Sequence, residues 1–132
     1  MRRFVRTLMA ALVAAPAAAA TALTAEEFDR YTRGRTLTYA LEGRVYGAEE
    51  YLPGRRVRWA FAGEDCRDGR WYPQDGDICF VYEHDPVPQC WQFFVAPGGL
   101  IARFSGDAET LPLTEVQQAP EGLLCPGPDV GV

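Results

Sequence analysis

Apolar and polar residues alternate along several short segments of the chain. Residues 55–61 place Val57, Trp59 and Phe61 at alternate positions, with arginines and one alanine between them. Successive side chains of a strand point to opposite faces of its sheet. The pattern therefore predicts a strand that is buried on one face.

Two other segments carry large apolar side chains on both sets of alternate positions. They are residues 77–83 (DICFVYE) and 89–95 (QCWQFFV). A strand that is apolar on both faces is normally covered on both. We expect these two strands at the centre of a sheet, with their second face covered by an N-terminal helix or by the C-terminal tail.

Short runs rich in β-branched and aromatic residues follow one another along most of the chain, separated by glycine, proline and aspartate. The runs span residues 36–41, 44–52, 55–61, 69–73, 77–83, 89–95, 100–104 and 111–116. Turn signals at residues 53–54, 75–76 and 97–99 favour tight hairpins between neighbouring runs. The regular spacing predicts a mainly β fold, either a small antiparallel meander or an up-and-down barrel or half-barrel.

A short helix is expected ahead of the strands. Thr24 and Glu27 have the spacing of a capping box, in which each residue satisfies a backbone N–H of the other. Phe28 gives this segment an apolar position, and Gly34 is a residue at which helices often stop. The helix should span about residues 24–33.

The first residues of the chain have the composition of a secretory signal peptide. Three arginines precede an apolar stretch at residues 8–15, which runs into a tract of alanines. The stretch is shorter than the roughly 20 residues that a membrane-spanning helix needs. We expect residues 1–20 to be a signal peptide, cleaved after Ala20 or Ala22, and the protein to be periplasmic or secreted.

The remaining chain, residues 21–132, is short enough for a single domain. It keeps 10 basic and 18 acidic side chains, which gives a net charge of −8. A negative charge opposes non-specific binding to nucleic acid. All the basic residues are arginines, so chemistry that needs a lysine is excluded.

Cys79 and Cys90 flank an aromatic segment that also holds His84. A zinc site would normally have ligand pairs two to four residues apart, and a redox site would normally have a C-x-x-C motif. A hairpin that turns near His84 instead places Cys79 opposite Cys90, close enough for a disulfide. Pro86 and Pro88 disrupt this pairing and could widen the turn, because neither can donate to the ladder. Four cysteines allow three connectivities, and the one we rank first pairs Cys79 with Cys90 and Cys66 with Cys125. In this pairing the second bridge would fasten the proline-rich tail, residues 117–132, to the body as an extended strap.

Few residues offer conventional catalytic chemistry. Ser105 is the only serine and His84 the only histidine, and Ser105 lacks the G-x-S-x-G context of a hydrolase nucleophile. Pairs of neighbouring carboxylates are more numerous, and in turns of a small acidic protein such groups are usually solvated. The pairs are Glu49 with Glu50, Glu64 with Asp65, and Glu83 with Asp85.

Arginines cluster in the first half of the domain. Arg55, Arg56 and Arg58 form a stripe that Arg33 and Arg35 could extend. Such a stripe could hold an anion by bidentate contacts, or it could be an exposed strand face whose charges discourage aggregation.

Residues 63–91 resemble small exported bacterial proteins of unknown function. The pattern consists of C-x-x-G-x-W, here Cys66, Gly69 and Trp71, then I-C-F-x-Y at residues 78–82, then Cys90-Trp91. Gly69-Arg70-Trp71 also resembles the short G-x-W signature of lipocalins. This second resemblance implies a lipocalin-like, small up-and-down barrel.

Binding is the function class that these observations favour, and no catalytic residue, metal or cofactor is expected. The aromatic residues either fill the core or line a cavity for a small apolar or aromatic ligand. The candidate lining residues are Trp59, Trp71, Phe80, Tyr82, Trp91 and Phe93. Two alternatives remain: a module that binds an envelope protein through the loop at residues 83–89, and a small hydrolase.

Overall fold

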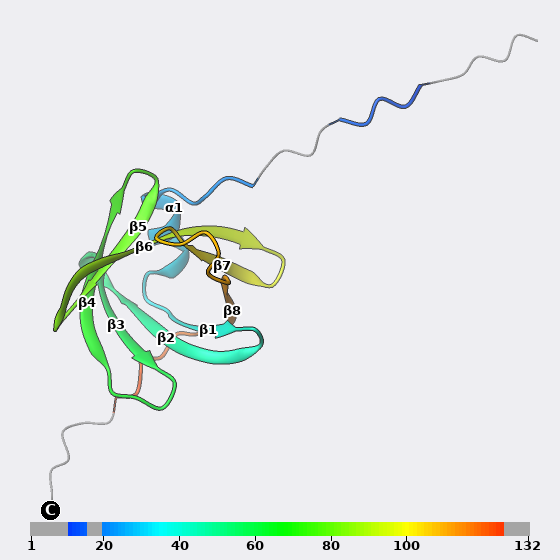
Figure 1. Cartoon of the computed structure of the whole chain (residues 1–132). Helices are drawn as coiled ribbons and strands as arrows, with labels where there is room; N and C mark the ends of the chain where they lie inside the picture. The colour runs from blue at the N-terminus through cyan, green and yellow to red at the C-terminus, as the bar shows by residue number, and fades with distance from the viewer. Residues whose placement is uncertain (1–10, 16–19, 126–132) are drawn as a thin grey trace, which may run out of the picture.

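The computed structural model describes residues 11–15 and 20–125, and eight of its strands close into an antiparallel barrel (Figure 1). Each strand pairs with the next in sequence, and the last pairs with the first. The elements are α1 (Ala25–Thr32), β1 (Thr36–Leu41), β2 (Arg44–Leu52), a 3₁₀ turn η1 (Pro53–Arg55), β3 (Arg56–Phe61), β4 (Arg67–Gln74), β5 (Asp77–Tyr82), β6 (Asp85–Ala96), β7 (Gly99–Phe104) and β8 (Leu113–Ala119). The prediction of a mainly β, up-and-down fold is confirmed.

Tight turns join most of these strands. Between β4 and β5, Asp75 and Gly76 adopt φ angles of 50° and 82°, a conformation that Asp and Gly tolerate and that matches the twist of a hairpin. The prolines at positions 86 and 88 do not widen the next turn. They lie within β6, which begins at Asp85, four residues earlier than predicted, and its pairing with β5 contains a register irregularity.

The helix α1 begins and ends as the sequence predicts. The Thr24 side chain accepts a hydrogen bond from the Glu27 N–H, and the Glu27 side chain accepts one from the Thr24 N–H. Gly34 follows the helix with a φ of 77°, a left-handed conformation that suits glycine.

The position of α1 was not predicted correctly. Instead of covering the outer face of β5 and β6, the helix packs into the barrel, where Phe28 contacts the inward side chains of Phe80 and Phe93. In a closed barrel no strand is central. Val81 and Phe94 are half-buried on the outer surface.

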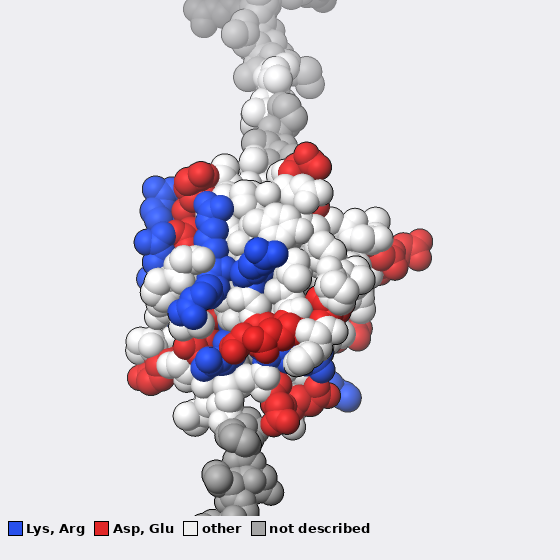
Figure 2. Space-filling view, turned by 90° about the vertical axis from the view of Figure 1, so that its left-hand side faces the viewer, with Lys and Arg blue, Asp and Glu red and all other residues white. Residues whose placement is uncertain are grey.

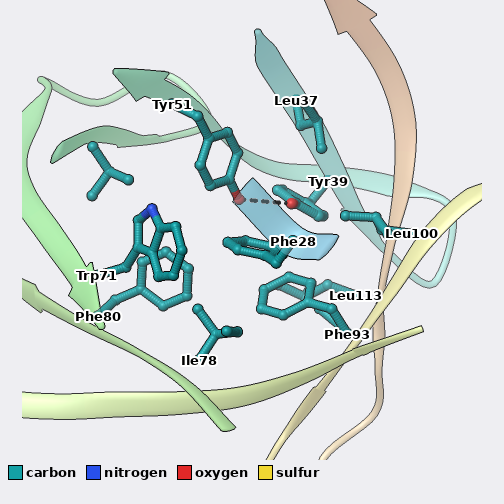
Figure 3. Packing of buried hydrophobic residues seen from close by; sticks show 12 residues of the cluster. Phe28, Leu37, Tyr39, Tyr51, Trp71, Ile78, Phe80, Phe93, Leu100 and Leu113 are labelled. Atoms are coloured by element: carbon teal, nitrogen blue, oxygen red, sulfur yellow. Dashed lines mark hydrogen bonds between the residues drawn. The ribbon is translucent and has the colours of Figure 1, made fainter. Parts of the chain in front are cut away.

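Phe28 is the centre of the core (Figure 3). It is completely buried. Its ring centroid lies 4.5 Å from that of Phe93, 5.2 Å from Trp71 and 5.5 Å from Tyr51. Three of its four aromatic contacts are edge-on, a favourable arrangement for aromatic rings. The Phe28 side chain thus fills the interior of the barrel at the end where α1 lies.

Both predicted disulfides are present. Cys79 lies directly opposite Cys90 in the β5–β6 ladder and is bonded to it, and Cys66 is bonded to Cys125. Because all four sulfur atoms are bonded in pairs, the alternative thiolate metal site and the redox site at these cysteines are wrong. Disulfides form and persist in oxidising compartments, which indicates a location outside the cytoplasm.

The segment after β8 crosses the outside of the barrel as a strap. Thr36 Oγ1 donates a hydrogen bond to the Glu121 carbonyl, and the Leu123 N–H donates one to Glu50 Oε2. The strap then reaches Cys66 through the disulfide at Cys125. The predicted strap is confirmed up to Cys125, although β8 extends further along the chain than expected.

The expected signal peptide falls mostly on residues 1–10 and 16–19, which lie outside the described residues. Among the residues that are described, no helix has the length and apolar character needed to cross a membrane. On the side of the barrel where β4 lies, acidic and basic side chains are interspersed on the surface (Figure 2).

Candidate ligand-binding site

The two ends of the barrel differ. One end holds α1 together with the turns that follow β2, β4 and β6. The opposite end carries the connections at residues 42–43, 62–66, 83–84 and 105–112. A cavity of about 70 Å³ enters the interior from this second end. A single water needs roughly 10–15 Å³ on this measure, so there is room for several waters or for a small ligand.

Aromatic rings form most of the cavity wall. Tyr46, Trp59 and Phe61 form one group, with centroids 6.0 Å apart for Tyr46 and Trp59 and 5.3 Å apart for Trp59 and Phe61. Phe80 and Tyr82 stack 6.3 Å apart on β5 and belong to the same wall. Rings that support one another hold a preformed surface for a flat or apolar group.

Charged and polar groups surround the entrance. Arg67 lies with its guanidinium carbon 5.3 Å from the centroid of the Phe61 ring, and its Nη2 is 3.7 Å from Glu64 Oε2. Asp85 and Gln89 on β6 also border the cavity. The entrance thus carries charged groups of both signs beside an apolar interior.

Glu49 is a carboxyl group inside this aromatic wall. Its side chain comes from β2 between Leu37 of β1 and Trp59 of β3, which are its partners in the two ladders, and it is only 2% exposed. Tyr82 donates its hydroxyl to Glu49 Oε1 over 2.7 Å. Glu49 Oε2 is buried and has no hydrogen-bond partner among the described residues.

Burial governs the protonation of Glu49. Loss of solvation raises the pKa of its carboxyl to about 8, although the hydrogen bond from Tyr82 acts in the opposite direction. At pH 7 the side chain is therefore mostly a neutral acid in the cavity wall. Such a group can donate a hydrogen bond when protonated and can hold a cation when ionised.

Two tyrosines complete the polar part of the interior. The hydroxyls of Tyr39 and Tyr51 are 2.8 Å apart and hydrogen-bonded to each other (Figure 3). Burial raises the pKa of both phenols well above the ordinary value of 10. One of these hydroxyls donates to the other, and among the described residues neither tyrosine donates to the second oxygen of Glu49.

Glu115 is the other buried carboxylate, and its surroundings are different. Its Oε2 accepts hydrogen bonds from the Tyr31 hydroxyl over 2.7 Å and from the Leu100 N–H over 2.6 Å. Its Oε1 accepts one from the Gln118 amide. Both oxygens are satisfied, and Glu115 links α1 to the barrel as a structural group.

Five of the six predicted lining residues border the cavity: Trp59, Phe80, Tyr82, Trp91 and Phe93. Trp71 does not. It is 3% exposed and packs against Phe28, beneath the cavity and toward the helix. The aromatic residues therefore divide between the two roles that the sequence left open, a filled core near α1 and a lined cavity at the other end.

The prediction that the paired carboxylates are solvated is wrong for Glu49. It is correct for Glu64, Asp65 and Glu83, which are exposed. The signal for Glu49 was present in the sequence, since residues 49 and 51 share one face of a strand and Tyr51 is a natural core residue. The charged residue type predicts that the Glu49 side chain is exposed to solvent, whereas the alternation of the strand predicts the buried position that is observed.

The arginine stripe does not form a common anion site. Arg55 lies over the Trp71 ring at 4.7 Å, and Arg58 pairs with Asp68 at 2.8 Å. Arg56 lies opposite Arg70 in the β3–β4 ladder. The proposed docking loop at residues 83–89 is the β5–β6 turn and the start of β6, where Val87 is 66% exposed.

Comparison with protein families, with curated proteins and with solved structures found no match to this chain. The resemblance of residues 63–91 to exported bacterial proteins and to lipocalins stays a prediction. The candidate site therefore has to be interpreted from its own geometry.

Proposed function

We propose that this is an exported binding protein, periplasmic or secreted, that takes a small aromatic ligand into the open end of its barrel and performs no chemistry on it. The observation that supports this proposal is the cavity of about 70 Å³, walled by aromatic rings and closed at its inner end by the packed core around Phe28. Ligand sites typically combine such apolar walls with few polar groups.

The size and shape of the cavity favour one ring and a short side chain. Room for several waters corresponds to a ligand of that size, and rings such as Trp59 and Phe80 offer it stacking or edge contacts. Displacing poorly bound water from an apolar surface favours binding.

The three tryptophans provide a test with its own internal control. Trp59 and Trp91 border the cavity, whereas Trp71 packs beneath it. We expect 2-phenylethanol, an uncharged probe, to shift the indole N–H resonances of Trp59 and Trp91 saturably in nuclear magnetic resonance spectra. The Trp71 resonance should move much less.

Single Trp→Phe variants would assign the three signals. Two outcomes would overturn the proposal. One is the absence of any saturable shift up to the solubility limit of the probe. The other is an equal, non-saturating shift of all three signals, which would indicate non-specific contact with the surface.

A further inference from the structure

The two buried carboxyl groups of the barrel differ in a way that points to the chemistry of the ligand. Glu115 has hydrogen-bond donors on both oxygens and lies away from the cavity. Glu49 lines the cavity, has a donor on Oε1 only, and keeps Oε2 buried without a partner among the described residues. An unsatisfied buried oxygen is costly, and native proteins rarely keep one without a reason.

We propose that Glu49 is the anchor for a ligand that carries a protonated amine on a small aromatic body, with the ammonium group donating to Glu49 Oε2. This inference rests on the proposed function and specifies its ligand class. Oε2 is shielded from solvent as it stands, but the terminal torsion of a glutamate side chain turns easily. The proposal requires a rotation of the carboxyl that brings Oε2 to the cavity while Oε1 stays within reach of the Tyr82 hydroxyl.

The surroundings of Glu49 suit a cation. Trp59 is the neighbour of Glu49 on β3, and Tyr46 packs beside Trp59 on the same cavity wall. Aromatic rings beside a carboxylate are the arrangement that proteins use to hold alkylammonium ligands. The face of Phe61 already carries the Arg67 guanidinium at the entrance. The net charge of the protein is negative, which favours the approach of cations.

Ligand binding should be coupled to ionisation of Glu49. Its pKa of about 8 means that the carboxylate, the form that holds an ammonium group, is a minor species at pH 7. Burial raises the pKa of Tyr39, Tyr51 and Tyr82 on the same wall above the ordinary phenol value, so these three groups do not titrate together with Glu49. Asp85 is the only other carboxyl at the cavity, and it lies at the entrance.

A matched set of probes separates this inference from the proposed function. Phenethylamine, 2-phenylethanol and 3-phenylpropionate share a ring and a short chain and differ in their charged or neutral end. We expect phenethylamine to bind at least about tenfold more tightly than 2-phenylethanol at pH 8, as a hydrogen bond to a charged group allows. The carboxylate probe should bind least.

The pH dependence gives a second readout on the unmodified protein. An ammonium group of this kind stays protonated to about pH 9. Its affinity should therefore follow the ionised fraction of Glu49 and increase about fivefold from pH 7 to pH 8. Phenethylamine binding at pH 7 should also release close to one proton per site, measurable by calorimetry in buffers of different ionisation enthalpy.

Glu49→Gln and Tyr82→Phe locate the effect, and Glu50→Gln is the control. Glu49→Gln should abolish the preference for the amine, measured as the ratio of the phenethylamine and 2-phenylethanol affinities of the same variant, whereas Glu50→Gln, one residue away on the outer face, should leave this ratio unchanged. Tyr82→Phe keeps the ring and removes the donor that favours ionisation, so it should weaken amine binding at pH 7. This second variant serves if Glu49→Gln fails to fold.

The outcomes are distinguishable. If 2-phenylethanol binds and phenethylamine binds no better at any pH, the inference is wrong and the proposed function stands. If the amine is preferred equally by wild type and Glu49→Gln, the preference reflects overall charge, and the inference is also wrong. If no probe binds, both fail.

Discussion

Glu49 and Glu50 are adjacent and chemically identical, and the barrel wall separates them. The Glu49 side chain points inward, to the Tyr82 hydroxyl, and the Glu50 side chain points outward, where it accepts the Leu123 N–H of the strap. Strand periodicity alone produces this division. Of the two carboxyl groups, only Glu49 is removed from water without a hydrogen-bond partner for each oxygen among the described residues. The free-energy cost of desolvation therefore falls on Glu49.

That cost should appear in the pH dependence of stability. The carboxyl of Glu49 has a pKa of about 8 in the folded protein and an ordinary value near 4.5 otherwise. Between these values the folded state holds one proton more than the unfolded state, so stability decreases as pH rises from about 4.5 to about 8. The stabilisation that comes with a protonated Glu49 is present in full only below about pH 4.5 and is lost as the pH rises through about 8.

The Glu49→Gln variant removes this titration. We expect the free energy of unfolding of wild type to fall relative to that of Glu49→Gln by on the order of 4 kcal/mol between pH 4 and pH 9, because the pKa of Glu49 is about 8 in the folded protein and 4.5 otherwise and each pH unit between these values corresponds to about 1.4 kcal/mol. Urea unfolding at a series of pH values measures the difference. Parallel pH profiles for the two proteins would show that Glu49 ionises normally, and Glu50→Gln serves as the control.

Residue chemistry predicted part of the candidate site. The apolar character of large aromatic residues at alternate strand positions does not depend on the register of the strands. The sequence therefore identifies Trp59, Phe80 and Tyr82. Glu49 was missed because its type suggests solvent, and only its phase relative to Tyr51 indicates the interior. The role of Trp71 could not be separated from that of Trp59, since which end of the barrel a residue occupies depends on strand register and on where α1 packs.

At the scale of elements, α1 decides which part of the interior stays open. The helix has eight residues and inserts Phe28 among rings from β2, β4, β5 and β6. Its capping box fixes the start of the helix, and Tyr31 connects its last turn to Glu115 on β8. A short helix of this kind is stable because of its packing, not because of its intrinsic propensity.

Phe28→Ala should therefore destabilise the whole barrel. Truncating a fully buried phenylalanine typically costs about 3–5 kcal/mol, and here four aromatic rings lose their common neighbour. Phe28→Leu, which keeps most of the volume, should cost roughly 1 kcal/mol. Chemical unfolding of both variants measures the two values, and an unchanged midpoint for Phe28→Ala would show that the helix does not stabilise the barrel.

The elements themselves were more predictable than their arrangement. Local signals set the starts of β1 and β2 and the limits of α1, because caps, turns and alternation act over a few residues. The start of β6 was placed too late because Pro86 and Pro88 were expected to disrupt pairing, whereas the strand accommodates them beside a register irregularity. The interior position of α1 depends on contacts far apart in sequence, which alternation does not encode.

At the scale of the whole molecule, closure and cross-linking hold the open end together. The β1–β8 pairing closes the sheet, and the strap carries the chain from β8 to Cys66 in the connection between β3 and β4. Arg67, the next residue, borders the cavity entrance. The disulfide from Cys66 to Cys125 therefore anchors the edge of the site to the far end of the described chain.

The two disulfides should contribute differently to stability. Cys66 and Cys125 are 59 residues apart in sequence, and Cys79 and Cys90 are 11 apart. A cross-link that closes a longer loop restricts the unfolded chain more, which gives about 4 kcal/mol for the longer loop and about 3 kcal/mol for the shorter one in the chain-entropy treatment. Each value is a large part of the stability of a domain of this size.

Removing one pair at a time tests this ordering and the role of the strap. We expect the Cys66→Ala, Cys125→Ala double variant to lose more stability in urea unfolding than the Cys79→Ala, Cys90→Ala double variant. It should also expose the strap to proteolysis near residues 120–125, since among the described residues the hydrogen bonds at Thr36 and Glu50 would then have to hold it without a cross-link. The Cys79→Ala, Cys90→Ala variant should keep the strap protected, because that bridge lies within one hairpin. If removal of Cys66 and Cys125 leaves both the unfolding midpoint and the cleavage pattern unchanged, the strap makes no contribution to the stability of the barrel, and the entrance of the cavity must be held by the ladders alone.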